Sequence, residues 1–189
     1  MNQTFQALRV VSLLFLGAAW LNAATFTQTD NFAGSGDFTR TATFQKFGSS
    51  VGGGFTLTNV TIQFVPQFAL SDMVSNGTSI YQSYQVTFSQ SASFYDGSLT
   101  ATGAVSYGFG PVTYALSNGA TRPLSSSYSN VTNSISSSTQ PSLLTMFSGN
   151  GATNLFITTA TSTSLSSGVS LITNNPAVSG TLTVIYTYK

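Results

Sequence analysis

The sequence predicts an all-β protein, an antiparallel β-sandwich of jelly-roll or Ig-like type with roughly seven to ten strands. Three observations predict this fold. Apolar and polar residues alternate with a period of two over many short stretches, as in half-buried strands. Turn dipeptides separate these stretches. Strong helix formers are scarce after the first 24 residues, where Ser, Thr, Gly and Asn dominate.

Residues 1–24 are expected to form a helical secretory signal peptide. Arg9 supplies a sparse basic segment, an apolar run follows, and cleavage is expected after Ala23 or Ala24. The alternative is a retained membrane anchor, but the apolar run of about a dozen residues is shorter than the ~20 that span a bilayer. We therefore expect residues 25–189 to form one exported β-sandwich domain without a membrane span.

The first half of this domain alternates in four stretches. The expected strands are residues 25–29, 38–47, 55–64 and 80–94. The expected turns or loops are residues 30–37, 48–54 and 71–79, the last of which contains Asn76-Gly77. Pro66 is expected to weaken its strand, or to mark an edge or a bulge, because proline cannot donate to a ladder.

The second half begins with the clearest hairpin. Asp96-Gly97 is expected to join residues 80–94 to a return strand that runs from Leu99 to Phe109. Further strands are expected at residues 111–116, 154–164 and 180–188, and residues 125–138 are a weak strand or a surface loop. Turns are expected at Asn118-Gly119 and at residues 149–151, and residues 141–147 are a buried bend or one helical turn.

The last expected strand shows the alternation most plainly. Leu182, Val184 and Tyr186 share one parity, while threonines dominate the other. Successive side chains of an extended chain point to opposite faces. This strand should therefore bury one face and present a threonine-rich face.

Composition excludes several functions. The chain has five Lys and Arg against four acidic residues, so no basic patch for nucleic acid is expected. It contains no His, Cys or Glu, which excludes a Ser-His-Asp or Cys-His site and the usual zinc sites. We therefore expect no enzyme and no cofactor.

Calcium is the one metal worth weighing. Asp30 and Asp37 flank a glycine-containing stretch, and carboxylate oxygens suit Ca²⁺. The competing interpretation is a plain loop in which each Asp caps its own backbone.

The eight Tyr and fifteen Phe residues have two interpretations. In the first, they fill the core of the sandwich. In the second, some of them form an exposed platform on which sugar rings stack. The candidates for this platform are Tyr81, Tyr95, Tyr107 and Tyr114.

Two blocks of sequence resemble a known family. The first is TATFQKF at residues 41–47, followed by the turn at 48–54 and LTNVTIQF at 57–64. The second pairs MFSGNGATNL at residues 146–155 with the closing strand at 180–188. Together they resemble the choice-of-anchor E domain family, which is associated with PEP-CTERM sorting. The resemblance implies a β-rich domain exported by the Sec route in a Gram-negative bacterium, associated with exopolysaccharide or biofilm material.

The chain also departs from that family. Gly48 stands where the family usually has Asp, and members usually continue into a sorting tail, a membrane helix and a basic cluster. Here Lys189 follows the closing strand, which favours either a released protein or a chain cut before its anchor. The resemblance transfers no catalytic or binding residue.

These observations leave three functions open. The first is a non-catalytic structural domain, secreted or on the bacterial surface and associated with the extracellular matrix. The second is a carbohydrate-binding or adhesin module that uses exposed aromatics. The third is a subunit that assembles edge to edge into fibres, because low charge leaves sheet edges unprotected. The expected partners are exopolysaccharide or other surface proteins, and the oligomeric state stays open.

Overall fold

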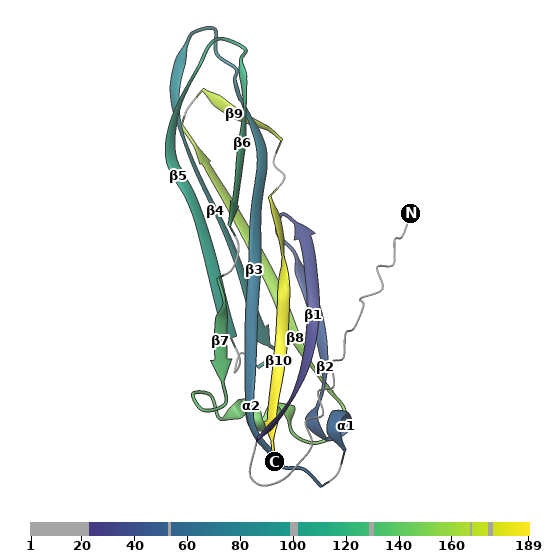
Figure 1. Ribbon diagram of the computed structural model, residues 1–189. Coiled ribbons are helices and arrows are strands. Elements are labelled where there is room, and N and C mark those ends of the chain that lie inside the picture. The colour runs from purple at the N-terminus through teal and green to yellow at the C-terminus, as the bar shows by residue number, and fades with distance from the viewer. Residues whose placement is uncertain (1–22, 53, 99–101, 129–130, 167, 174–175) are drawn as a thin grey trace, which may run out of the picture.

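The computed structural model describes residues 23–52, 54–98, 102–128, 131–166, 168–173 and 176–189, which form an elongated sandwich of two antiparallel sheets (Figure 1). Sheet A contains β1 (Ala24–Ser35), β3 (Leu57–Asn76), β6 (Thr121–Tyr128), β7 (Asn133–Ser136), β9 (Val169–Thr173) and β10 (Ala177–Tyr188). Sheet B contains β2 (Thr39–Gln45), β4 (Gln82–Asp96), β5 (Thr102–Leu116) and β8 (Ala152–Leu165). The helices α1 (Phe47–Val51) and α2 (Ser142–Phe147) lie at one end. The predicted all-β sandwich is confirmed.

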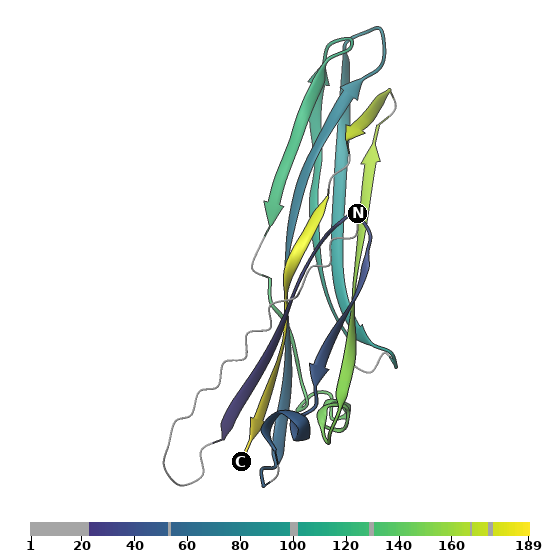
Figure 2. The same cartoon turned by 90° about the vertical axis from the view of Figure 1, so that its right-hand side faces the viewer.

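Strand β3 organises sheet A. The strand order is β1-β10-β3-β6, and β7 and β9 also pair with β3. In sheet B the order is β2-β8-β4-β5. Ala24 at the start of β1 pairs with Tyr188 at the end of β10, so the first described strand begins where the last one ends. The turns that join β3 to β4 and β5 to β6 lie at the opposite end of the molecule (Figures 1 and 2).

The core lies between the sheets in two clusters of buried side chains. The larger cluster fills the end near the helices and includes Phe44, Phe64, Phe94, Leu182 and Tyr186. The smaller cluster consists of Val74, Tyr84, Val86, Leu116 and Leu124. Burial of these apolar side chains is the main favourable contribution to folding.

Several strand predictions are confirmed. Residues 82–94 of the alternating stretch 80–94 lie in β4, and residues 154–164 lie in β8. The closing strand is β10, in which Leu182, Val184 and Tyr186 are fully buried. Strands β4 and β5 pair antiparallel, as the Asp96-Gly97 dipeptide predicted. The apolar residues at 141–147 form the helix α2.

Two predicted loops are wrong. The stretch 30–37 was expected to be a loop, but β1 runs through Ser35 because its backbone pairs with β10 as far as Ala177. The stretch 71–79 was also expected to be a loop, but β3 continues to Asn76 because β6 and β9 flank it. Two inward positions there, Asp72 and Asn76, are polar, yet the pairing with β6 and β9 keeps the stretch a strand.

Three local predictions need a smaller correction. The glycine-rich stretch 48–54 was expected to be a turn, but the helix α1 occupies its first part and ends at Gly52. The stretch 111–116 was expected to be a separate strand and is the end of β5. The stretch 125–138 contains two strands, the end of β6 and β7, and both pair with β3. The predicted signal peptide lies almost wholly outside the described residues.

Strand β3 continues through Pro66, and of the predicted alternatives a local edge fits the pairing, because neither β6 nor β7 pairs with Pro66. Pro66 lies opposite Gly180 of β10, and the other edge of β3 changes partner there, from β7 at residues 61–64 to β6 at residues 68–75. Gly180 has φ +156°, and a Cβ on it would lie 2.3 Å from the Val65 carbonyl oxygen and 2.8 Å from the Pro66 Cα. The missing side chain therefore permits β10 to approach β3 at the proline.

Side chains tie the two sheets together along the side formed by β1 and β2. Arg40 donates a hydrogen bond from Nη2 to Oδ1 of Asp30 at 3.1 Å. Gln28 donates from Nε2 to the Gln45 carbonyl oxygen at 2.7 Å and accepts from the Gln45 N–H at 2.9 Å. The Gln28 amide therefore satisfies backbone groups on the free edge of β2, much as another strand would.

The outward faces of both sheets carry no charged residue among the described positions. The charged residues of the strands occupy the inward-facing parity, and they are Asp30, Arg40, Asp72, Asp96 and Arg122. The outward positions are mainly hydroxyl-bearing, as in the row Thr39, Thr158 and Ser93 across β2, β8 and β4. Both faces are therefore neutral and rich in hydroxyl groups.

The pKa of Tyr186 predicts how the free energy of unfolding depends on pH. Its ring is buried, and its hydroxyl donates to the Gln45 carbonyl oxygen at 2.7 Å. Burial raises the pKa of Tyr186 well above its ordinary value of 10, because the phenolate loses its hydration, and burial also raises the pKa of Tyr84. The folded state therefore binds these protons more tightly than the unfolded state does.

We expect the free energy of unfolding to be level up to about pH 9 and to fall above about pH 10, by up to ~1.4 kcal/mol per pH unit for each such group. Denaturant titrations at neutral and alkaline pH measure this slope. The control is Tyr186→Phe, which should start less stable at neutral pH and show a shallower alkaline slope. If the free energy of unfolding of the variant fell as steeply with pH as that of wild type, Tyr186 would not be the group responsible.

Candidate functional site

Three turns come together at the end of the sandwich that lies away from Ala24 and Lys189 (Figures 1 and 2). They are residues 77–81 between β3 and β4, residues 117–120 between β5 and β6, and residues 166 and 168 between β8 and β9. We call these residues the distal tip. A Cβ on Gly168 would lie 3.0 Å from Thr78 Cγ2 and 2.5 Å from Gln82 Oε1, so the third turn packs against the first.

Asn76 holds the distal tip together. Its side chain is fully buried at the last position of β3. Its Nδ2 donates to the carbonyl oxygens of Ile80 at 2.9 Å, Leu116 at 3.0 Å and Ser117 at 3.3 Å. Its Oδ1 accepts from the N–H of Thr78 at 2.9 Å and from the Thr78 hydroxyl at 2.7 Å.

The Asn76 backbone also joins the two main turns. Its N–H donates to the Ala120 carbonyl oxygen, and its carbonyl oxygen accepts from the Gly119 N–H, both at 3.1 Å. The predicted Asn118-Gly119 turn is confirmed here, with Gly119 at φ +67°. One buried residue thus joins two turns that lie about forty positions apart in the chain. A buried amide whose hydrogen bonds are all formed makes the local structure rigid.

The distal tip presents two large apolar side chains to solvent. Tyr81 is 67% exposed and Ile80 is 61% exposed, more than any other large apolar side chain among the described residues. They immediately precede β4, whose Tyr84 belongs to the smaller core cluster. Exposed apolar groups on an ordered loop are typical of binding sites.

The other predicted platform tyrosines lie elsewhere. Tyr107 and Tyr114 occupy inward-facing positions of the edge strand β5 and brace it against sheet A. The Tyr107 ring stacks on Tyr128 at 4.9 Å, and its hydroxyl bonds to Ser126. The Tyr114 ring lies under the Arg122 guanidinium, whose Cζ is 4.3 Å from the ring centroid. The four tyrosines therefore do not form one row, and only Tyr81 belongs to the distal tip.

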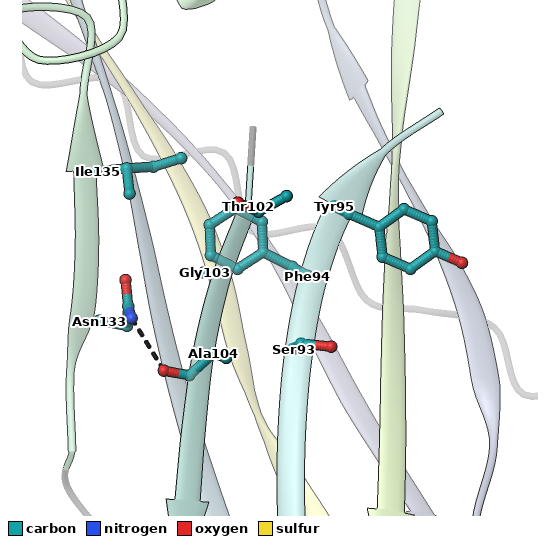
Figure 3. Close-up of a pocket in the computed structure, with 8 residues that line it drawn as sticks. All are labelled: Ser93, Phe94, Tyr95, Thr102, Gly103, Ala104, Asn133 and Ile135. Carbon is teal, nitrogen blue, oxygen red and sulfur yellow. Dashed lines mark hydrogen bonds between the residues drawn. The ribbon is translucent and has the colours of Figure 1, made fainter. Parts of the chain in front are cut away.

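Tyr95 lies on the outward face of sheet B. It stacks against Phe156 of β8, with ring centroids 5.4 Å apart, and is only partly exposed. Beside it, an open hollow of about 530 Å³ lies between β4, β5 and β7 (Figure 3). In Figure 3 Tyr95 points away from Phe94, because adjacent residues of a strand face opposite sides.

A glycine and an amide shape this hollow. A Cβ on Gly103 would lie 2.4 Å from Phe94 Cε1, so the strand leaves no side chain there. Asn133 of β7 donates from Nδ2 to the Ala104 carbonyl oxygen at 3.0 Å and so occupies part of the free edge of β5 (Figure 3). The lining holds no titratable group other than Tyr95.

The two calcium candidates have separate protein partners. Asp30 accepts from Arg40, and Asp37 Oδ1 accepts from the Thr161 N–H at 2.7 Å and from the Thr161 hydroxyl at 2.9 Å. Asp30 lies within β1, whereas Asp37 caps the edge of β8 beyond the end of β2. No group of three or more metal-ligating acidic residues occurs in the described part of the chain.

Sequence reasoning found Tyr81 but missed Asn76 and Ile80. Asn76 was interpreted as half of a turn dipeptide, and Ile80 as the start of a strand. The sequence does contain a pattern that marks them, since an apolar pair follows Asn-Gly by two residues between two alternating runs. The hydrogen bonds from Asn76 to the second turn have no sequence pattern of their own.

No protein-family model matches the chain, and no curated protein matches it. Among solved structures, a chain of the infectious bursal disease virus Gx strain matches with a TM-score of 0.25 and 14% identity over 92% of this chain and 45% of that one. A chain of infectious bursal virus derived T=1 particles matches with a TM-score of 0.23 and 14% identity over 84% of this chain and 35% of that one. The present chain thus spans less than half the length of either, and similarity at this level carries no argument about function.

None of the helices in the described residues is long and apolar enough to cross a membrane.

Proposed function

We propose that the protein is a non-catalytic structural domain, exported to the cell surface or the extracellular matrix of a bacterium. The observation that carries this proposal is the pair of neutral, hydroxyl-rich outward faces described above. The few charged strand residues are turned inward, where Arg40 and Asp30 brace the sheets. Such faces suit contact with hydrated, hydroxyl-rich matrix, and exopolysaccharide or other surface proteins are the expected partners.

Two further observations support the proposal. The residues before β1 have the layout of a cleavable leader, and cleavage after Ala23 would leave β1 intact from Ala24 onward. The sequence blocks that resemble the choice-of-anchor E family correspond to β2, the first part of β3, the start of β8 and β10, so they belong to both sheets. They point to the same cellular setting.

Export is tested by expressing the chain with its own leader in a Gram-negative host and fractionating the culture. We expect the protein in the medium, on the cell surface or in the matrix, with a mature N-terminus at Ala24 or Thr25 by mass spectrometry. A variant without residues 1–23 is the control and should stay in the cytoplasm. An uncleaved wild-type chain in the cytoplasm would refute the proposal.

The second candidate function is a carbohydrate-binding or adhesin module. The observation that favours it is the exposed pair Ile80 and Tyr81 on the ordered distal tip. Edge-to-edge fibre assembly has less support, because side chains occupy backbone groups on several free edges. Gln28 does so on β2, Asp37 on β8 and Asn133 on β5.

A further inference from the structure

We propose that the distal tip binds neutral polysaccharide, with Tyr81 and Ile80 as the apolar contact and the surrounding hydroxyl and amide groups as hydrogen-bond partners. The inference deepens the carbohydrate-binding candidate and rests on it. It assigns that function to one end of the sandwich, whereas sequence reasoning distributed it over four tyrosines.

The first argument is contact area. Tyr81 and Ile80 are 67% and 61% exposed, so most of the surface of each side chain is in contact with solvent. A tyrosine ring offers a large flat apolar surface together with a hydroxyl, and aromatic rings dominate the energetics of many interfaces. The apolar C–H face of a sugar ring is complementary to such a surface.

The second argument is preorganisation. Binding by a mobile loop is weakened by the entropy lost when the loop becomes ordered. Asn76 has already ordered this loop, since its side chain bonds to Ile80 and Thr78 within the first turn and to Leu116 and Ser117 at the second. The turn that carries Tyr81 is therefore ordered before any ligand arrives.

The third argument is charge. Residues 76–82 and 116–121 include no Asp, Glu, Lys or Arg. The nearest cation along the chain, Arg122, is held over the Tyr114 ring. Anionic glycans and anionic membranes are recognised through Lys and Arg side chains. The distal tip lacks these side chains. A neutral polymer rich in hydroxyl groups matches Thr78, Ser79 and Asn118.

The fourth argument is position. The distal tip lies at the opposite end of the long axis from both Ala24 and Lys189 (Figure 1). Whatever holds the chain at those ends leaves the distal tip free to reach a polymer.

Affinity gel electrophoresis of the mature secreted chain tests the inference, with cellulose-derived hydroxyethylcellulose and galactomannan as neutral probes. Alginate is the anionic probe, and vesicles of phosphatidylcholine and phosphatidylglycerol are tested by co-sedimentation. We expect retardation by at least one neutral polysaccharide and none by alginate. Tyr81→Ala should weaken this binding about tenfold or more, the scale of a lost aromatic contact. Tyr81→Phe should keep most of it.

The matched control is Tyr128→Ala, the same substitution at a tyrosine that stacks on Tyr107 on the side of the sandwich. It tests whether the loss of a structural aromatic contact weakens binding by itself, and it should change affinity less than about twofold. If wild type binds a neutral polysaccharide and Tyr81→Ala binds equally well, the tip assignment is overturned while the carbohydrate-binding candidate stands. If wild type binds alginate and no neutral probe, the inference is overturned while the carbohydrate-binding candidate stands. If wild type binds none of the polysaccharides, or binds only vesicles, both are overturned. The export experiment decides the structural proposal separately.

Discussion

Asn76→Asp is expected to lower the free energy of unfolding by about 3 kcal/mol, although it replaces one atom by another of similar size. The Nδ2 group of Asn76 faces three carbonyl oxygens at 2.9–3.3 Å. A carboxylate oxygen there would lose all three hydrogen bonds and would repel each carbonyl. The introduced carboxylate would also be fully buried, since Asn76 has no exposed area.

Denaturant unfolding at neutral and mildly acidic pH measures this effect. The loss should shrink as pH falls, because burial raises the pKa of the introduced carboxyl group and protonation removes its charge. Asn118→Asp is the matched control, because it makes the same change at an exposed position of the distal tip and should cost less than about 0.5 kcal/mol. Equal stability of the two variants would show that Asn76 does not hold the distal tip together.

Gly180→Ala is expected to destabilise the sandwich by about 3 kcal/mol or more, from overpacking combined with an unfavourable backbone conformation. The added Cβ would lie 2.3 Å from the Val65 carbonyl oxygen, a backbone atom that cannot move without shifting β3. It would also lie 2.9 Å from the Phe32 ring, so the added Cβ would clash with both neighbouring strands, β1 and β3. Thermal and denaturant unfolding measure the loss.

Gly108→Ala is the control for this substitution. Gly108 lies in β5 with nothing within 4 Å of an added Cβ. The change there should be neutral or stabilising by up to about 1 kcal/mol, because alanine restricts the unfolded chain. A loss at Gly180 no larger than at Gly108 would mean that β10 and β3 can separate locally at Pro66 without cost.

The sequence allowed the prediction of strands in which at least three successive inward positions are apolar. Tyr84, Val86 and Phe88 in β4 and Leu182, Val184 and Tyr186 in β10 repeat every second residue, and both strands form as expected. The continuation of β3 beyond Ser71 escaped prediction because two of its inward positions are polar. Asp72 and Asn76 are buried there, and only the flanking strands β6 and β9 make that continuation a strand.

The candidate site was less predictable than the fold. Tyr81 was one of four candidate tyrosines, and nothing in the sequence separated it from the other three. Tyr107 and Tyr114 looked equivalent to it in sequence, and their roles as braces depend on partners in β6, at Tyr128 and Arg122. Contacts between strands that are distant in sequence decide which aromatic groups remain free, and alternation alone does not report them.

The inward placement of charge also determines how the molecule responds to salt. Dissolved ions act mainly on charges at a surface, with a screening length of about 10 Å at 0.1 M. Here the ion pair between Arg40 and Asp30 spans the gap between the sheets, and the outward faces in the described residues offer ions nothing to screen. The two outward faces therefore present the same neutral surface in dilute freshwater, in brine and in a drying film.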